Sequence, residues 1–190
     1  MIVKSNLYIL HMVCMIQNDP AIYSIKGGDE MVYLLIILGI VFMETRIKNY
    51  MEKNKNLGDR QEILGGRIII RKHYNRGMFL NYLEDKRELV KMISSVLLGF
   101  LILLFILVLP KKGKRMYKLG LSLVLGGAIS NVSDRYNRGY VVDYFSFNCK
   151  KLKKIIFNLS DIFIFIGSFF IMLTSLFSKE IEDCAEDILS

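Results

Sequence analysis

The chain has 190 residues, of which 53% are hydrophobic and 23% charged, and its formal net charge is +8. This length suits a single domain, and a mean hydropathy of +0.36 is high for so charged a chain. The basic residues flank apolar runs, which favours anionic lipid headgroups over nucleic acid as their partners. Three cysteines, Cys14, Cys149 and Cys184, lack metal-ligand spacing, and their odd number argues against a disulfide framework.

Residues 1–30 are predicted to form an amino-terminal extension. Lys4 precedes the apolar run LYILHMVCMI, which has some features of a signal peptide. No small-residue cleavage site follows, and His11 interrupts the run. We interpret the segment as an amphipathic or disordered extension, with Met31 as an alternative start of the functional chain.

Four apolar runs follow, and they predict a mainly α, polytopic membrane protein. Residues 92–109 contain no charged residue over 18 positions, which is long enough for a transmembrane helix. The other runs are shorter and become long enough when a few flanking polar residues are included. The predicted transmembrane helices are roughly 31–49, 91–109, 116–132 and 158–177.

The polar segment 50–90, between the first two helices, is predicted to form a small β cradle. Two short stretches, Gly65-Gly66 and Asn75-Arg76-Gly77, are turn signals, and the run RIIIR between them is typical of a strand. A sheet edge cannot lie naked in lipid, because its backbone groups would be unpaired. The sequence therefore places this sheet outside the hydrocarbon.

The short turn 110–118 indicates the orientation of the chain. Five of the eight residues after Pro110 are basic, which is typical of a cytoplasmic turn. Both termini would then be cytoplasmic, including a tail at 179–190, and segments 50–90 and 133–157 would be extracytoplasmic. A plain count gives 11 Lys and Arg in 48–91 and six in 134–157, which favours the inverted orientation. That alternative stays open.

Polar side chains gather where the predicted helices end, on one face of the membrane. Even numbers of crossings separate them, so they share that face in either orientation. Ionisable groups at membrane depth are costly and usually functional. The residues are Glu44, Lys48, Asn75, Asn131, Asp134, Arg135, Asp143, Asn158 and Asp161.

Asp143 and Asp161, 18 residues apart, are the natural catalytic pair. Two carboxyl groups close together in a low dielectric can share one proton. The charged one can act as general base on water, and the protonated one can polarise a scissile carbonyl. A structural interpretation remains open, in which Asp161 and Asn158 cap a helix and Asp134–Arg135 is a surface ion pair.

The order of the motifs carries a family resemblance. GGAISNVSDRYNRGYVVDYF, followed by IFNLSD, contains Asn-x-x-Asp-Arg, Gly-x-Val-x-Asp and Phe-Asn-x-small-Asp. This pattern resembles the lipoprotein signal peptidase (signal peptidase II) family over about residues 31–177. Asn75 and Gly77 are similar to the family's Asn-x-Gly motif. The matching positions are Asn131, Asp134, Arg135, Gly139, Val141, Asp143, Phe157, Asn158, Ser160 and Asp161.

The resemblance implies a membrane aspartyl endopeptidase that needs neither metal nor cofactor, with Asp143 and Asp161 as its catalytic residues. It implies supporting or substrate-binding roles for Asn75, Gly77, Asn131, Arg135, Asn158, Glu44 and Lys48. The implied substrates are bacterial prolipoproteins with a diacylglyceryl-modified Cys, cut just before that Cys. The implied location is the bacterial cytoplasmic membrane, whose lipids surround the protein, with the site at the extracytoplasmic face. The implied peptidase domain is residues 31–178.

The sequence departs from the family pattern in four places. Ser130 stands before Asn131, where the family often has Gly, and the amino-terminal extension has no counterpart in the family. The first helix of the family usually carries Asp-x-x-x-Lys, and here the pair is Glu44 and Lys48. The residues after Asn-x-Gly are usually small, and here they are Met78-Phe79-Leu80, so the cradle or lid over the site is expected to differ. We further interpret Tyr144 and Phe145 as interfacial anchors.

Two other functions compete with peptidase activity. A non-catalytic homologue could act as a membrane scaffold or lipoprotein-binding protein, although the presence of both aspartates disfavours it. A small proton-relaying transporter predicts internal symmetry between halves, and the sequence has none.

Overall fold

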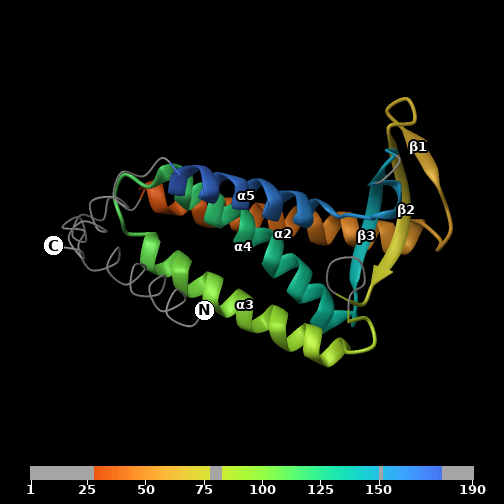
Figure 1. Cartoon of the computed structure of the whole chain (residues 1–190), viewed down its shortest axis with the longest axis horizontal. Helices are drawn as coiled ribbons and strands as arrows, with labels where there is room; N and C mark the ends of the chain where they lie inside the picture. Colours follow the sequence, from red (N-terminus) through yellow and green to blue (C-terminus); the bar gives the residue numbers. More distant parts are fainter. Residues whose placement is uncertain (1–27, 78–82, 150–151, 177–190) are drawn as a thin grey trace.

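The computed structural model describes residues 28–77, 83–149 and 152–176. The predicted extension up to residue 27, the tail after 176 and Met78-Phe79-Leu80 lie outside the described residues. Within these ranges, four helices run lengthwise, and a small sheet stands across them at one end (Figure 1). The helices are α2 (Gly28–Asn54), α3 (Arg87–Val108), α4 (Arg115–Asn137) and α5 (Leu159–Leu176).

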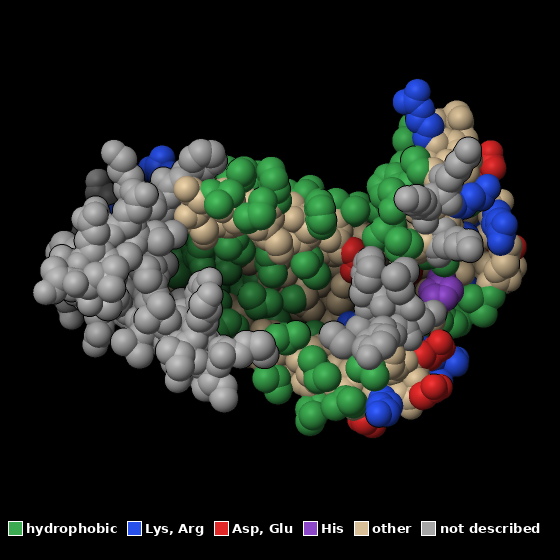
Figure 2. Space-filling model, viewed as in Figure 1, with side chains coloured by type: hydrophobic (Ala, Val, Ile, Leu, Met, Phe, Trp, Pro, Cys, Tyr) green, Lys and Arg blue, Asp and Glu red, His purple; other side chains and the backbone are tan. Residues whose placement is uncertain are grey.

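The four helices confirm the predicted helical segments but extend beyond some of their expected ends. Among the described residues, α3 and α5 are long and apolar enough to cross a membrane. The other two carry polar groups in their interior turns, such as Glu44 and Lys48 on α2 and Asn131 and Asp134 on α4. On the face in Figure 2, apolar side chains cover the helices and charged side chains gather mainly over the sheet end.

Helix α4 lies at the centre of the bundle, against α2, α3 and α5. A buried apolar cluster joins three of these helices and consists of Tyr33, Ile37, Phe105, Leu121 and Leu125. Between apolar helices such side chains hold the bundle together through close van der Waals packing. The cluster holds the helices together away from the sheet, which leaves the sheet end free for polar residues.

Glycines bring α4 and α5 into backbone contact. A Cβ atom on Gly127 would lie 2.5 Å from the carbonyl oxygen of Ser160, and one on Gly167 would lie 2.5 Å from that of Gly120. Only glycine permits so close an approach, because real Cβ atoms do not come this near a backbone oxygen. Gly127 therefore permits close packing of the two helices, and its contact is next to Asp161.

Replacing Gly127 by alanine should displace the first turn of α5 and lower activity far more than it lowers membrane insertion. The new methyl group must push away the Ser160 carbonyl, and a shift of about 1 Å at a catalytic group can reduce the rate about 100-fold. Gly39→Ala on α2 is the matched control, because a Cβ there meets nothing within 4 Å. Equal activity of the two variants would contradict this interpretation.

The sheet has three antiparallel strands in the order β1 (Gln61–Ile63), β2 (Ile68–Asn75) and β3 (Val141–Phe147). Gly65 and Gly66 have positive φ in the turn between the first two strands, as the turn signal predicted. The third strand comes from the segment between α4 and α5. Within the predicted segment 133–157, Asp143 is therefore in the middle of a strand, β3.

The register of β2 and β3 decides which residues face the helices. His73 pairs with Asp143 and Asn75 with Val141, after an irregularity between Ile70 and His73. Directly paired residues point to the same face, and their neighbours along the strand point to the other. Asn75 and Asp143 therefore share one face of the sheet, and Tyr144 points to the opposite one.

Candidate active site

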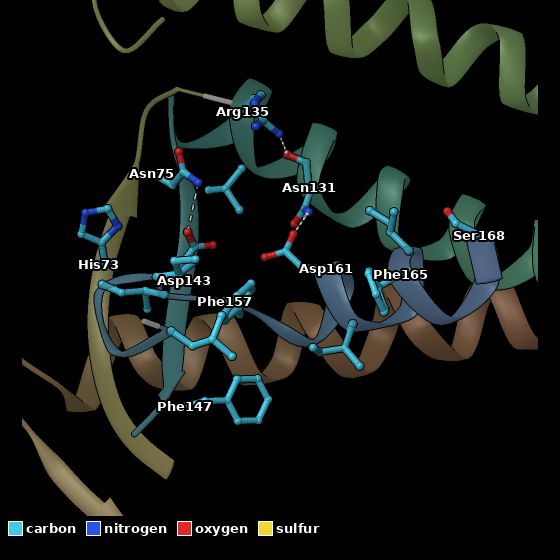
Figure 3. A pocket seen from close by; sticks show the side chains of 16 residues that line it. His73, Asn75, Asn131, Arg135, Asp143, Phe147, Phe157, Asp161, Phe165 and Ser168 are labelled. Atoms are coloured by element: carbon cyan, nitrogen blue, oxygen red, sulfur yellow. Dashed lines mark hydrogen bonds between the residues drawn. The ribbon is translucent and has the colours of Figure 1, made fainter. Parts of the chain in front are cut away.

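Asp143 and Asp161 line one cavity of about 670 Å³ where the sheet meets the helices (Figure 3). Asp143 is in the middle of β3 and is 2% exposed. Asp161 is the third residue of α5. The two residues come from elements separated by a loop and a short 3-10 turn, η2 (Leu152–Lys154), and the fold directs both carboxyl groups into the same space.

Asp143 accepts one hydrogen bond on each carboxyl oxygen. The Asn158 side-chain amide donates to Oδ1 (2.7 Å), and the Asn75 side-chain amide donates to Oδ2 (3.1 Å). Both donors were predicted as site residues from the sequence. The two bonds fix the plane of the carboxyl group relative to the cavity.

Asp161 is held in the same way, by two donors. The Asn131 side-chain amide donates to Oδ1 (3.0 Å), and the backbone N–H of Asn158 donates to Oδ2 (3.2 Å). The Asp161 N–H in turn donates to Asn158 Oδ1 (3.0 Å), which is the reciprocal pattern of a capping box. Asp161 thus caps α5 and faces the cavity at once, so the capping interpretation and the functional one do not exclude each other.

Burial and the nearby Asp161 carboxylate raise the pKa of Asp143 from an ordinary 3.8 to about 7. The hydrogen bonds from Asn158 and Asn75 and the charge of Lys48 act in the opposite direction. Burial and the Asp161 charge outweigh these opposing effects, because a second charge in a poorly solvated site is costly. At neutral pH the pair therefore holds a proton on a substantial fraction of the molecules.

The stability of the chain should fall as pH rises from about 4 to about 7. The raised pKa of Asp143 means that the folded state binds the proton more tightly than the unfolded state does. The stabilisation by this proton is complete below the pKa that Asp143 has in the unfolded state. It is lost as the pH rises through the pKa that Asp143 has in the folded state. Thermal unfolding in detergent, compared with Asp143→Asn, measures it. A difference between the two unfolding temperatures that stays constant over this range would refute the raised pKa.

Lys48 is the centre of a buried ionic network beside the two aspartates. Its ammonium group lies 3.3 Å from Glu44 Oε2 and 3.0 Å from Asp134 Oδ2. It also donates to Ser130 Oγ (2.9 Å) and Asn131 Oδ1 (3.0 Å). Because Asn131 presents its oxygen to Lys48, its amide nitrogen faces Asp161. Lys48 therefore orients the group that binds one of the two aspartates.

Arg135 connects the end of α4 to the turn after β2. Its guanidinium donates to the carbonyl oxygen of Gly77 (3.1 Å) and to that of Asn131 (3.3 Å). The Gly77 N–H donates to Asn75 Oδ1 (3.2 Å), which fixes the amide that binds Asp143. The alternative of an Asp134–Arg135 ion pair is not what forms, since Asp134 pairs with Lys48 and with Arg138 (3.3 Å).

The rest of the cavity wall is mainly apolar and comes from β3, the 152–157 segment and the first turns of α5. Phe165 is 76% exposed on the helix surface, so this wall continues onto a face suited to lipid. An apolar chain could lie here with a polar bond beside the carboxyl groups. The apolar lining residues are Val141, Phe147, Leu152, Ile155, Ile156, Phe157, Ile162, Ile164 and Phe165.

All the predicted site residues meet at this end of the fold, and the structure adds three more. Ser130 binds Lys48, His73 lines the cavity opposite Asp143, and Tyr144 binds Glu44. The expectation that Tyr144 is an interfacial anchor is wrong, because it is only 5% exposed. The run VVDYFSF was the available signal, because its β-branched and aromatic residues are typical of a strand, in which Asp143 and Tyr144 face opposite sides.

The fold and the site define a class: a helical membrane protein with two hydrogen-bonded carboxyl groups at the polar end of an apolar cavity. Comparisons with known proteins then identify the family. The sequence profile of the signal peptidase (SPase) II family matches residues 36–177. The chain belongs to this family.

Curated relatives named lipoprotein signal peptidase support the assignment. The protein from Caldicellulosiruptor bescii is 35% identical over 151 residues, which cover 79% of this chain and 93% of that protein. The one from Fusobacterium nucleatum is 27% identical over 154 residues, covering 81% and 92%.

Two solved structures described as bacterial membrane enzymes share the fold. One has a TM-score of 0.68 at 23% identity and covers 76% of this chain and 87% of its own. The other has a TM-score of 0.66 at 23% identity and covers 78% and 94%.

Proposed function

We propose that this chain is a membrane aspartic endopeptidase that removes the signal peptide from diacylglyceryl-modified bacterial prolipoproteins, cutting just before the lipid-bearing Cys. Membership of the signal peptidase II family supports the reaction and the substrate class. The observation that supports the aspartic type is the pair Asp143 and Asp161, each with both carboxyl oxygens bound by N–H donors.

The chemistry follows from one proton shared by the pair. The charged carboxylate takes a proton from a water molecule, whose oxygen attacks the carbonyl before the Cys. The protonated carboxyl donates to the carbonyl oxygen and stabilises the charge that develops there. The tetrahedral intermediate then breaks its C–N bond, and the first aspartate returns its proton to the leaving nitrogen. The products are a signal peptide with a free carboxyl group and a lipoprotein whose first residue is the modified Cys.

The supporting residues keep the two carboxyl groups in place during this cycle. Asn75, Asn131 and Asn158 hold them through N–H donors, and Arg135 holds the turn at Gly77. Glu44 and Lys48 act behind this shell, through the network that fixes the amide of Asn131. No metal or cofactor enters the proposed reaction.

The same proposal gives the chain its place in the membrane. All four helices cross the bacterial cytoplasmic membrane, with polar faces of α2 and α4 turned toward each other. The peptidase domain is 31–178, the residues before it form an extension and those after 178 a cytoplasmic tail. The sheet end is extracytoplasmic, and 50–90 acts as a cradle or lid. A lipid-bearing substrate then reaches the apolar cavity wall laterally from the surrounding lipids.

Purified full-length chain in detergent or lipid, incubated with a diacylglyceryl-modified prolipoprotein, tests the proposal. We expect release of the signal peptide from the lipidated precursor and none from the unlipidated one. Binding of the lipidated precursor without cleavage, by a chain that is folded, would instead support the non-catalytic scaffold.

A further inference from the structure

A single buried side chain connects the two elements that carry the aspartates. Tyr144 follows Asp143 on β3 and points to the opposite face of the sheet. Its hydroxyl oxygen accepts a hydrogen bond from the backbone N–H of Leu159 (3.1 Å), at the start of α5. The hydroxyl also donates to Glu44 Oε1 (2.6 Å), on α2. Three elements therefore meet at one phenol.

The main chain of Tyr144 strengthens the same connection. Its N–H donates to the carbonyl oxygen of Phe157 (2.9 Å), and the Phe157 N–H donates to the carbonyl oxygen of Phe145 (2.7 Å). Tyr144 thus binds the residue before Asn158 with its backbone and the residue after it with its side chain. Asn158 is the residue that hydrogen-bonds both aspartates. Fixing its two neighbours fixes its position.

Glu44 depends on Tyr144 for its hydrogen bonding. The carboxylate is fully buried, at 0% exposure, and Lys48 approaches its Oε2 only as an ion-pair contact at 3.3 Å. The three donors of the Lys48 ammonium have closer partners, namely Ser130, Asn131 and Asp134. Burial and the Glu44 charge raise the pKa of Tyr144, so its hydroxyl keeps its proton at neutral pH and stays a donor.

The length of the Glu44 side chain matters for this contact. Its two carboxyl oxygens face Lys48 on one side and Tyr144 on the other. An aspartate, one methylene shorter, would keep the negative charge beside Lys48 but would not reach both partners. At the position where the family usually has Asp, the longer side chain of Glu44 thus allows a hydrogen bond with the phenol of Tyr144.

We propose that Tyr144, anchored by Glu44, is a positioning residue that sets the relative placement of Asp143 and Asp161. It acts through Leu159 and Asn158 and does not touch the reacting atoms. The inference rests on the proposed peptidase activity and extends it to a residue outside the cavity.

Steady-state cleavage of the lipidated precursor by Tyr144→Phe, Glu44→Asp and Glu44→Gln tests the inference. Tyr144→Phe and Glu44→Asp should lower kcat roughly 10- to 100-fold, with a smaller change in KM because the cavity wall is intact. Glu44→Gln keeps the length and the acceptor for the phenol, so its kcat should fall less than that of Glu44→Asp. The double variant Tyr144→Phe/Glu44→Asp should be no slower than either single one, since all three break the same connection.

The pH dependence of kcat separates positioning from general loss of structure. The charged groups around Asp143 and Asp161 are Lys48, Arg135 and Glu44, and Tyr144→Phe changes none of them. Looser placement of the two carboxylates weakens their mutual repulsion, so the descending limb near pH 7 should move to lower pH in Tyr144→Phe. If the substitution only destabilised the fold and left the site correctly arranged, kcat would fall at every pH and the descending limb would stay at the same pH.

Tyr140→Phe is the matched control, because its hydroxyl also donates to a glutamate, Glu52 (3.3 Å), without a connection to either aspartate. Its kcat and pH profile should equal those of the natural chain. If the natural chain cleaves and Tyr144→Phe matches it, the inference is overturned while the peptidase assignment stands. The inference is also overturned if Glu44→Asp retains activity and Glu44→Gln loses it. The negative charge at position 44 would then matter, and the length of the side chain would not. If the natural chain does not cleave, the proposed function itself has failed.

Discussion

Asp143→Asn and Asp161→Asn should each abolish measurable cleavage of the lipidated precursor. General acid–base catalysis contributes about 10²–10⁴-fold, and an asparagine can neither take the proton from water nor return it to the leaving nitrogen. The loss is expected in kcat, because the apolar cavity wall that receives the substrate is unchanged. Combining the two substitutions should cost little more than either alone, since the carboxyl groups act as one unit.

An exposed aspartate provides the control for these variants. Asp85→Asn, outside the cavity, removes a charge without touching the site and should leave activity unchanged. Binding of the lipidated precursor, measured separately, should persist in Asp143→Asn. A variant of either cavity aspartate that keeps full activity while folded would rule out the aspartic mechanism.

Lys48→Met should strongly destabilise the chain. Lys48 is 1% exposed and neutralises two buried carboxylates, on Glu44 and Asp134. Removing one partner of a buried ion pair lowers the free energy of unfolding by about 3–5 kcal/mol, because the remaining charge is left uncompensated. Activity should fall as well, because the Asn131 amide is then free to turn its oxygen toward Asp161.

Lys53→Met on the same helix is the comparison for this result. Lys53 is exposed in the last turn of α2, and such surface substitutions usually change stability by less than about 0.5 kcal/mol. Thermal unfolding in detergent measures both variants, and Glu44→Gln added to Lys48→Met should recover part of the loss. Equal unfolding temperatures for the two single variants would mean that the buried network does not stabilise the fold.

The sequence predicted the helices because apolar runs and basic turns are local properties of the chain. It predicted that Asp143, Asp161 and their three asparagines share one membrane face, since even numbers of crossings separate them. It also predicted the β2 strand from RIIIR between two glycine turns. Composition predicted α2 and α4 less clearly, because polar residues interrupt their apolar pattern. These polar residues find their partners only in the folded bundle.

The tertiary structure decided how those residues are paired. No spacing in the chain says that Asp134 pairs with Lys48 on another helix and not with its neighbour Arg135. Nor does it say that β3 completes a sheet that begins at Gln61, some 80 residues earlier. Strand register turned Tyr144 away from the lipid interface and into contact with Glu44, because adjacent residues of a strand face opposite sides. The sequence by itself thus determined which chemical groups the site contains, and it predicted that they share one membrane face. Their hydrogen-bond partners, and the buried residues that hold them, depend on contacts between distant segments, which only packing in three dimensions establishes.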